Sequence, residues 1–144
     1  MKKTFLAWMA IVAYVVLASL ACAAEQLALN IDTSKWKLGY SAADNKQGIK
    51  EYCRIGESVE NWTELVTVQA FFGLQRSQTA GMFMSNMLNT VRKSCPDAMC
   101  KVIRESPGDV LFEWEVRNTA GLPDQYEIDR VIAGSNALWV LHYA

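Results

Sequence analysis

The chain has 144 residues, and 14 basic against 15 acidic residues give it a formal net charge of −1 at pH 7. Without Lys2 and Lys3, which belong to the N-terminal segment described next, 12 basic residues remain against the same 15 acidic ones. A slightly acidic chain with no basic stripe argues against binding to nucleic acid. Once that segment is removed, about 120 residues remain, which suits one domain with one core.

The N-terminus has the pattern of an export signal. Lys2 and Lys3 precede an apolar run over residues 4–20, and the small residues Ala21-Cys22-Ala23 follow it. A basic start, an apolar stretch and small residues before the cleavage point are typical of secretory signals. We therefore predict a signal peptide over 1–23, cleavage just before Ala24 or Glu25, and a periplasmic or secreted protein of bacterial origin.

Two alternatives to cleavage remain open. Lipidation of Cys22 would make the protein a membrane-anchored lipoprotein, although Ser19 stands where an aliphatic residue is expected. The second alternative is that residues 4–24 are retained as a membrane anchor, because their length is close to the ~20 apolar residues that span a bilayer. We expect membrane association only in these two cases.

After a loosely ordered lead-in over 24–34, residues 35–144 are predicted to form a single domain that begins with three strands. Apolar and polar residues alternate over 36–40 and again over 49–55. Residues 62–72 are rich in β-branched and aromatic side chains, which suit a half-buried pleated surface. The polar stretch 42–48 is predicted to be the first turn.

One amphipathic helix follows, between Ser77 and Ser94. Its apolar residues recur three and four positions apart, which places them on one helix face. Ser77 is the predicted N-cap, and Pro96 prevents continuation of the helix. The apolar face consists of Ala80, Phe83, Met84, Met87, Leu88 and Val91.

Four more strands are predicted over 99–105, 110–117, 126–132 and 137–143. In the third of these, alternation assigns Tyr126, Ile128 and Ile132 to the core side. The same phase contains Arg130, which is either a rim residue or a buried charge paired with a carboxylate such as Glu51.

Short turns between successive strands imply antiparallel pairing, because parallel neighbours need long crossovers. The predicted fold is therefore α+β, with the order β-β-β-α-β-β-β-β. One helix packs on one face of a single twisted antiparallel sheet of about six to seven strands.

Three cysteines remain after signal cleavage, and export predicts a disulfide. We predict a Cys95–Cys100 bridge, which would join the helix end to the next strand and contribute about 2 kcal/mol in the chain-entropy model. Cys53 is then a buried free thiol. The alternative is a bridge from Cys53 to Cys95 or Cys100.

These cysteines do not predict catalysis. Four residues separate Cys95 from Cys100 at a helix C-terminus, whereas a thioredoxin-type site has two intervening residues at a helix N-terminus. A structural zinc site needs four Cys or His ligands, and the chain has one histidine. His142 is interpreted as a rim residue, and Cys53 would have to meet it to form a cysteine-protease pair. We predict no catalytic, cofactor or metal residues.

The acidic segment 56–64 suggests an alternative function. Glu57, Glu60 and Glu64 surround Trp62, and two such carboxylates in a cleft are the machinery of a small hydrolase. The favoured interpretation is a solvated turn, since surface carboxylates are common.

The tryptophan-centred segment 56–69 resembles a stretch shared by small exported proteobacterial proteins of unassigned function. The order of elements is similar to that of the PsbP/Mog1-like fold in the DcrB group. This resemblance implies an envelope accessory or binding role, and it supplies no catalytic residues.

The sequence thus favours an exported, non-enzymatic binding or envelope accessory module, with an acidic-site hydrolase as the alternative. Its partner, a protein or a small molecule, would contact the sheet face that the helix leaves uncovered. Apolar residues assigned to that face form an interaction patch or dimer contact, unless loops or the lead-in cover them. The candidate binding residues are Trp62, Glu64, Leu111, Val131 and Val140, and Leu65 and Leu138 share the predicted face.

Overall fold

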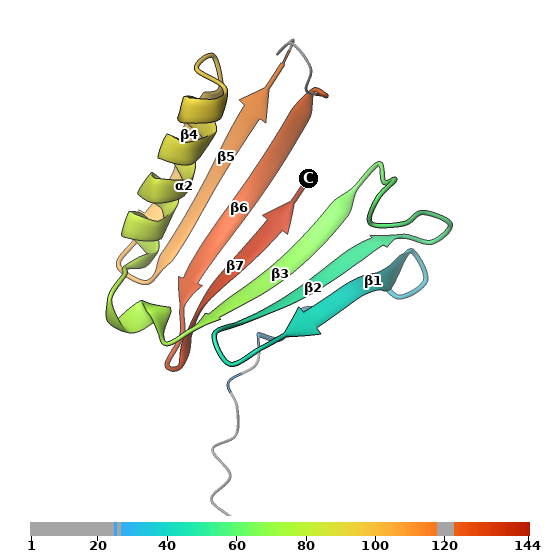
Figure 1. The fold of residues 1–144 in the computed structure, drawn as a ribbon, viewed down its shortest axis with the longest axis horizontal. Coiled ribbons are helices and arrows are strands. Elements are labelled where there is room, and N and C mark those ends of the chain that lie inside the picture. Colours follow the sequence, from blue (N-terminus) through green and yellow to red (C-terminus); the bar gives the residue numbers. More distant parts are fainter. Residues whose placement is uncertain (1–24, 26, 118–122) are drawn as a thin grey trace, which may run out of the picture.

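A computed structural model describes residue 25 and residues 27–117 and 123–144. In it, one antiparallel seven-stranded sheet has the order β1-β2-β3-β7-β6-β5-β4 (Figure 1). The predicted fold class and element order are confirmed. The predicted signal peptide and Cys22 lie outside the described residues. The strands are β1 (Trp36–Ala43), β2 (Gln47–Arg54), β3 (Leu65–Phe72), β4 (Met99–Ser106), β5 (Asp109–Val116), β6 (Gln125–Ala133) and β7 (Ala137–Tyr143).

One crossover sets the topology of the sheet. The chain leaves β3, passes through the helical segment to the far edge strand β4, and returns strand by strand to β7 (Figure 1). The last strand therefore lies at the centre, where it pairs with both β3 and β6. This insertion brings residues of β3 next to residues near the C-terminus.

The helical segment consists of a 3₁₀ turn, η1 (Leu74–Arg76), and the helix α2 (Ala80–Ser94). The helix begins two residues later than predicted because Thr79, rather than Ser77, is its N-cap. The Thr79 hydroxyl accepts a hydrogen bond from the Met82 backbone N–H at 3.1 Å. The Ser77 hydroxyl instead donates to the Leu74 carbonyl, which belongs to η1.

The core lies between α2 and the half of the sheet that it covers, which is formed mainly by β4, β5 and β6 (Figure 1). The predicted apolar helix face supplies three of its buried residues, and the Phe83 ring packs on Phe71 with 5.4 Å between centroids. Burying one large apolar side chain stabilises the fold by roughly 1.5–3 kcal/mol. The buried cluster is Ala80, Met84, Leu88, Val110, Phe112, Val131, Leu138 and Val140.

This cluster corrects the sequence analysis for Val131, Leu138 and Val140. They were assigned to the face opposite the helix, but all three are fully buried under α2. The register shows why, since Val131 pairs with both Val110 and Val140. Apolar residues occupy both phases of β6 and β7, so their alternation alone does not identify the buried face.

The predicted Cys95–Cys100 disulfide is also not present. Cys53, Cys95 and Cys100 are free thiols, and Cys53 is buried as expected. Cys95 is the buried C-cap of α2, whereas Cys100 lies on β4 opposite Trp114, with its sulfur 3.9 Å from the Ala98 carbonyl oxygen.

The lead-in has no regular secondary structure over its described residues, but it is attached to the sheet. The Glu25 carboxylate accepts hydrogen bonds from the backbone N–H groups of Ser135 and Asn136, both at 2.9 Å. These bonds lower the pKa of Glu25. Glu25 therefore ties the lead-in to the β6–β7 turn.

Candidate functional site

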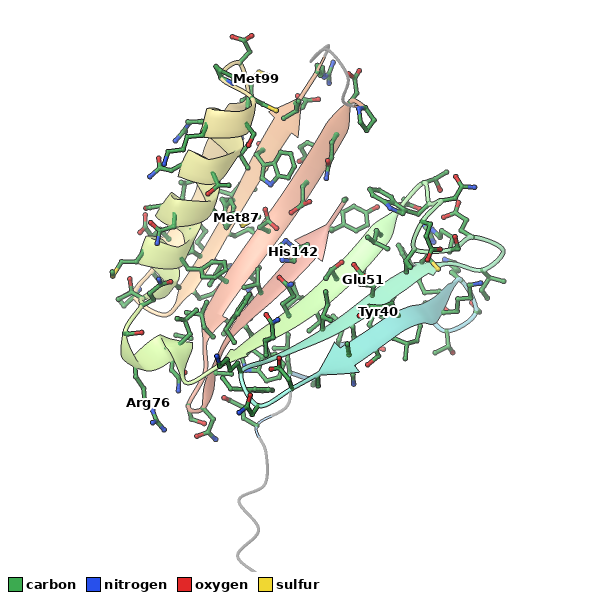
Figure 2. All side chains as sticks on the ribbon, viewed as in Figure 1. Tyr40, Glu51, Arg76, Met87, Met99 and His142 are labelled. Atoms are coloured by element: carbon green, nitrogen blue, oxygen red, sulfur yellow. The ribbon has the colours of Figure 1, made fainter. Side chains whose placement is uncertain are left out.

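Three ionisable side chains meet on the side of the sheet against which α2 packs. Asp129 on β6 pairs directly with His142 on β7, and Glu127 projects from β6 on the same side two residues earlier. Asp129 is fully buried and Glu127 is 8 % exposed. Figure 2 shows His142 near the middle of the sheet. Buried acidic residues are rare unless they are paired, so this cluster is the leading candidate site.

The facing atoms converge on one ring nitrogen. Nδ1 of His142 is 2.9 Å from Oε1 of Glu127 and 2.6 Å from Oδ1 of Asp129. A single N–H at Nδ1 is aligned with Glu127 Oε1, so the short contact with Asp129 leaves Oδ1 of Asp129 without an aligned hydrogen bond. The two carboxylates therefore compete for one donor.

Each of the three groups also makes a polar contact with a neighbouring side chain outside the cluster. The Trp114 indole N–H donates to Oδ2 of Asp129 at 3.0 Å, and the Gln125 amide donates to Oε2 of Glu127 at 3.3 Å. Nε2 of His142 is 3.2 Å from Oε1 of Gln69 on β3. These contacts fix the orientation of the cluster and leave one atom of each group facing the centre.

Burial and polar contacts shift the pKa values of all three groups. Burial raises the pKa of Asp129 to about 7. Burial alone would lower the pKa of His142, but the adjacent carboxyl groups of Asp129 and Glu127 outweigh this and raise it to about 9. Burial on its own would raise the pKa of Glu127, yet its contacts with His142 and Asp129 lower it overall. At neutral pH the cluster is thus an imidazolium beside an ionised Glu127, with Asp129 close to titration.

The sequence pattern does not predict this cluster, since it favours a position at the rim of the sheet for His142. Alternation along β6 favours Ile128 and Ile132 as the buried residues. This phase would place Glu127 and Asp129 on the solvent side of the sheet. One feature of the sequence could have indicated the cluster: these two acidic residues share a strand phase with the apolar Val131. The single histidine of the chain also lies in the predicted neighbouring strand.

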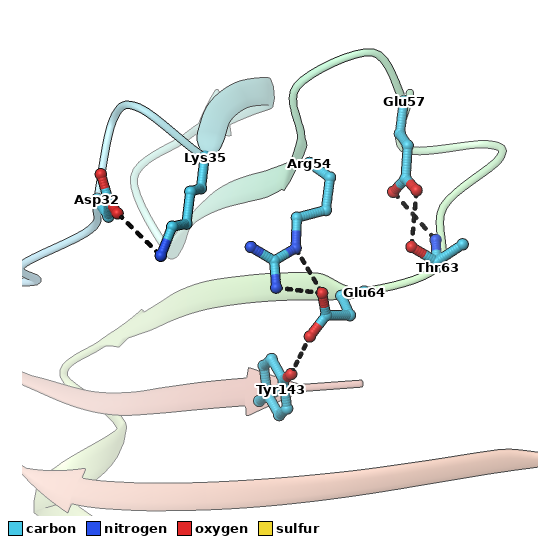
Figure 3. Close-up of polar contacts among 7 residues, drawn as sticks. All are labelled: Asp32, Lys35, Arg54, Glu57, Thr63, Glu64 and Tyr143. Atoms are coloured by element: carbon cyan, nitrogen blue, oxygen red, sulfur yellow. Dashed lines mark hydrogen bonds and ion pairs between the residues drawn. The ribbon is translucent and has the colours of Figure 1, made fainter.

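The three glutamates of the acidic segment do not form a comparable cluster. Glu57 accepts hydrogen bonds from the Thr63 backbone N–H at 3.0 Å and from its hydroxyl at 2.7 Å (Figure 3). Glu64 forms an ion pair with Arg54 and accepts a hydrogen bond from the Tyr143 hydroxyl. Glu60 is exposed.

These contacts do not favour acid catalysis by the segment. Hydrogen bonds from Thr63 lower the pKa of Glu57, and those from Tyr143 and Arg54 lower the pKa of Glu64. A general acid working near neutral pH needs a raised pKa. Both glutamates instead act as acceptors that order the turn and the sheet end.

Two of the predicted binding residues do come together. Trp62 and Glu64 line a shallow pocket of about 300 Å³ with Tyr126 and Tyr143. The Arg54 guanidinium, which pairs with Glu64, also stacks over the Trp36 ring at 4.3 Å from its centroid. This end of the sheet therefore combines aromatic and charged side chains.

Leu111, the remaining candidate, lies on the side of the sheet away from α2, which we call the open face. Its register neighbours across β6, β7 and β3 are Arg130, Leu141 and Val68. The lead-in covers part of the open face, where Leu27 and Leu29 line a pocket of about 240 Å³. The half-buried apolar residues of the open face are Val66, Val68, Leu111, Ile128, Ile132, Trp139 and Leu141.

Arg130 lies on the open face and not in the core. Its side chain is 43 % exposed and forms two hydrogen bonds to Asp109, at 2.7 and 2.9 Å. Arg104 reaches the same carboxylate at 3.0 Å. The suggested pairing with Glu51 is replaced by this cluster, because Arg130 and Glu51 project from opposite sides of the sheet.

No family model, curated protein or solved structure matches this chain. The resemblance to PsbP/Mog1-like proteins therefore stays a prediction. Over the described ranges, none of the helical segments has the length and apolar character needed to cross a bilayer.

Proposed function

We propose that this protein is an exported, non-enzymatic binding module that contacts another protein through its open face. The observation that carries the proposal is the one-sided coverage of the sheet. α2 packs on one side only, and the other side keeps apolar side chains at the centre of four neighbouring strands.

The composition of the open face supports a protein partner. Val68 and Leu141 lie side by side, and the Arg130–Asp109 pair flanks them. Apolar patches rimmed by charged residues are typical of surfaces that bind proteins. The charged rim would set the orientation of the partner while the apolar centre supplies the contact area.

Export is proposed on the predicted signal together with the position of Glu25. Cleavage at the predicted point would leave Glu25 at or next to the new N-terminus, and Glu25 is the residue that ties the lead-in to the β6–β7 turn. Intact mass of the protein from its native host tests this. We expect a chain that begins at Ala24 or Glu25 and has three thiols available for alkylation; a retained segment or acylated Cys22 would contradict soluble export.

Site-specific photocrosslinking in the native host tests the partner proposal. A photoreactive residue replaces Leu141 on the open face, and a matched one replaces the exposed Asn86 on α2. We expect one defined protein adduct from position 141 and none from position 86. The purified partner should then bind the unmodified chain and bind Val68→Asp at least tenfold more weakly.

Three outcomes would overturn the partner proposal. They are equal adducts from both positions, no adduct from position 141, or adducts that contain only a second copy of this chain.

A further inference from the structure

We propose that Glu127, Asp129 and His142 form a binding site for one divalent first-row transition-metal ion, with zinc as the reference ion. The ligand atoms would be Oε1 of Glu127, Oδ1 of Asp129 and Nδ1 of His142. This site lies on the helix side of the sheet, away from the open face, so it goes beyond the proposed function and does not depend on it.

The donor set is the first argument. One atom from each residue lies within 4.8 Å of the others. Carboxylate oxygens alone suit calcium or magnesium, whereas an imidazole nitrogen shifts preference to zinc and its neighbours. Three protein ligands also leave a coordination position for water or for a ligand donor, as in open zinc sites.

The supporting hydrogen bonds are the second argument, and they distinguish this cluster from a chance group of acidic residues. Metal-ligating histidines commonly donate their other ring N–H to a carbonyl or carboxylate. Here Nε2 of His142 faces Oε1 of Gln69 at 3.2 Å. Trp114 and Gln125 similarly hold the outer oxygens of Asp129 and Glu127, so every proposed ligand atom is the inner one.

The third argument is the buried oxygen of Asp129. Its Oδ1 lies in a fully buried residue, has no aligned hydrogen bond and faces His142. An unsatisfied buried oxygen is costly, and a bound cation would remove that cost. Binding would exchange the proton on Nδ1, released to solvent, for a bond between Nδ1 and the metal.

The residues that support the cluster are also accessible from the protein surface. A pocket of about 250 Å³ between the last turn of α2 and strands β5 and β6 is lined by Trp114 and Gln125. Glu127 and His142 keep small exposed fractions, 10 % and 17 % of their side chains. Two of the three proposed ligands therefore keep some contact with solvent.

The test uses the mature chain, stripped of metal with a chelator that is then removed. Zinc is titrated by calorimetry and cobalt by visible absorption. We expect one ion per chain, and a cobalt spectrum without a thiolate charge-transfer band. Glu127→Gln, Asp129→Asn and His142→Gln should each abolish detectable binding, whereas Glu57→Gln, a matched change at a carboxylate outside the cluster, should leave it unchanged.

Supporting-residue variants keep the test valid if a ligand variant fails to fold. Trp114→Phe and Gln125→Ala retain all three ligands, and each should weaken zinc binding by about 10- to 100-fold. A chain in which Cys53, Cys95 and Cys100 are serine should bind zinc as the original does. Melting curves identify variants that are unfolded.

The proposal is overturned if the folded chain binds no stoichiometric zinc, or if His142→Gln binds as tightly as the original. It is also overturned if the cysteine variant loses the ion, because the thiols would then be the ligands. These outcomes leave the photocrosslinking test of the open face unaffected.

Discussion

The Trp114 indole N–H and Oδ2 of Asp129 are joined by a hydrogen bond of 3.0 Å between β5 and β6. Trp114 is the register partner of Glu127, so it reaches Asp129 diagonally across the strand pair. The bond satisfies one oxygen of a fully buried carboxyl group. One aromatic side chain thus belongs both to the core and to the polar cluster.

Trp114→Phe should lower the free energy of unfolding by about 1–3 kcal/mol, because it leaves a buried oxygen of Asp129 without its donor. Urea unfolding measures the change. Trp62→Phe is the matched control, since Trp62 lines a shallow pocket at the surface and not the buried cluster. Equal losses in the two variants would show that the hydrogen bond contributes nothing specific.

Leu138→Ala and Leu111→Ala compare the two faces of the sheet with the same substitution. Leu138 is fully buried in the core, and Leu111 is half-buried on the open face. Deleting a fully buried leucine side chain costs about 2–5 kcal/mol, and the cost at Leu111 should be clearly smaller. Chemical denaturation of both variants checks the order, and a larger loss at Leu111 would contradict the assignment of faces.

Thr79→Ala should destabilise the protein by about 1 kcal/mol, because it removes the acceptor for the Met82 N–H at the start of α2. Ser77→Ala should change stability by less than about 0.5 kcal/mol, since Ser77 is exposed and lies outside the helix. Thermal unfolding distinguishes the two. If Ser77→Ala is the more damaging variant, the helix begins at the residue that the sequence predicted.

Asp109 should titrate below its ordinary pKa, because hydrogen bonds from Arg130 stabilise its charged form. A lowered folded-state pKa contributes stability that is present above the unfolded pKa and is lost as pH falls through the folded value. Arg130→Gln should therefore raise the pKa of Asp109, followed by NMR of its carboxyl carbon. It should also reduce stability at neutral pH, and this difference should disappear in acid.

Arg92→Gln is the control for this titration, since Arg92 is an exposed residue of α2. It removes the same charge elsewhere in the molecule. A shift of equal size in the Asp109 pKa would mean that net charge, and not the Arg130 contact, sets its value.

The sequence was sufficient to predict the order of the strands and of the main helix, although not the 3₁₀ turn η1. Alternation over 110–117 and the three-and-four spacing of Ala80, Met84 and Leu88 report local backbone geometry, which needs no knowledge of distant residues. Short turns then imposed antiparallel pairing. The predicted helix start was wrong by two residues because Ser77 and Thr79 are both competent caps, and only the path of the chain after η1 selects one.

The candidate site depended on tertiary structure. Ile128 and Ile132 occupy one phase of β6 and Val131 the other, so hydrophobicity gave no unique inward face, and the packing of α2 on Val131 decided it. That choice turned Asp129 inward. The insertion of β7 between β3 and β6 then brought His142 to Gln69, 73 residues away in the chain. Local periodicity determines which strands form, whereas strand order and helix docking decide which side chains meet.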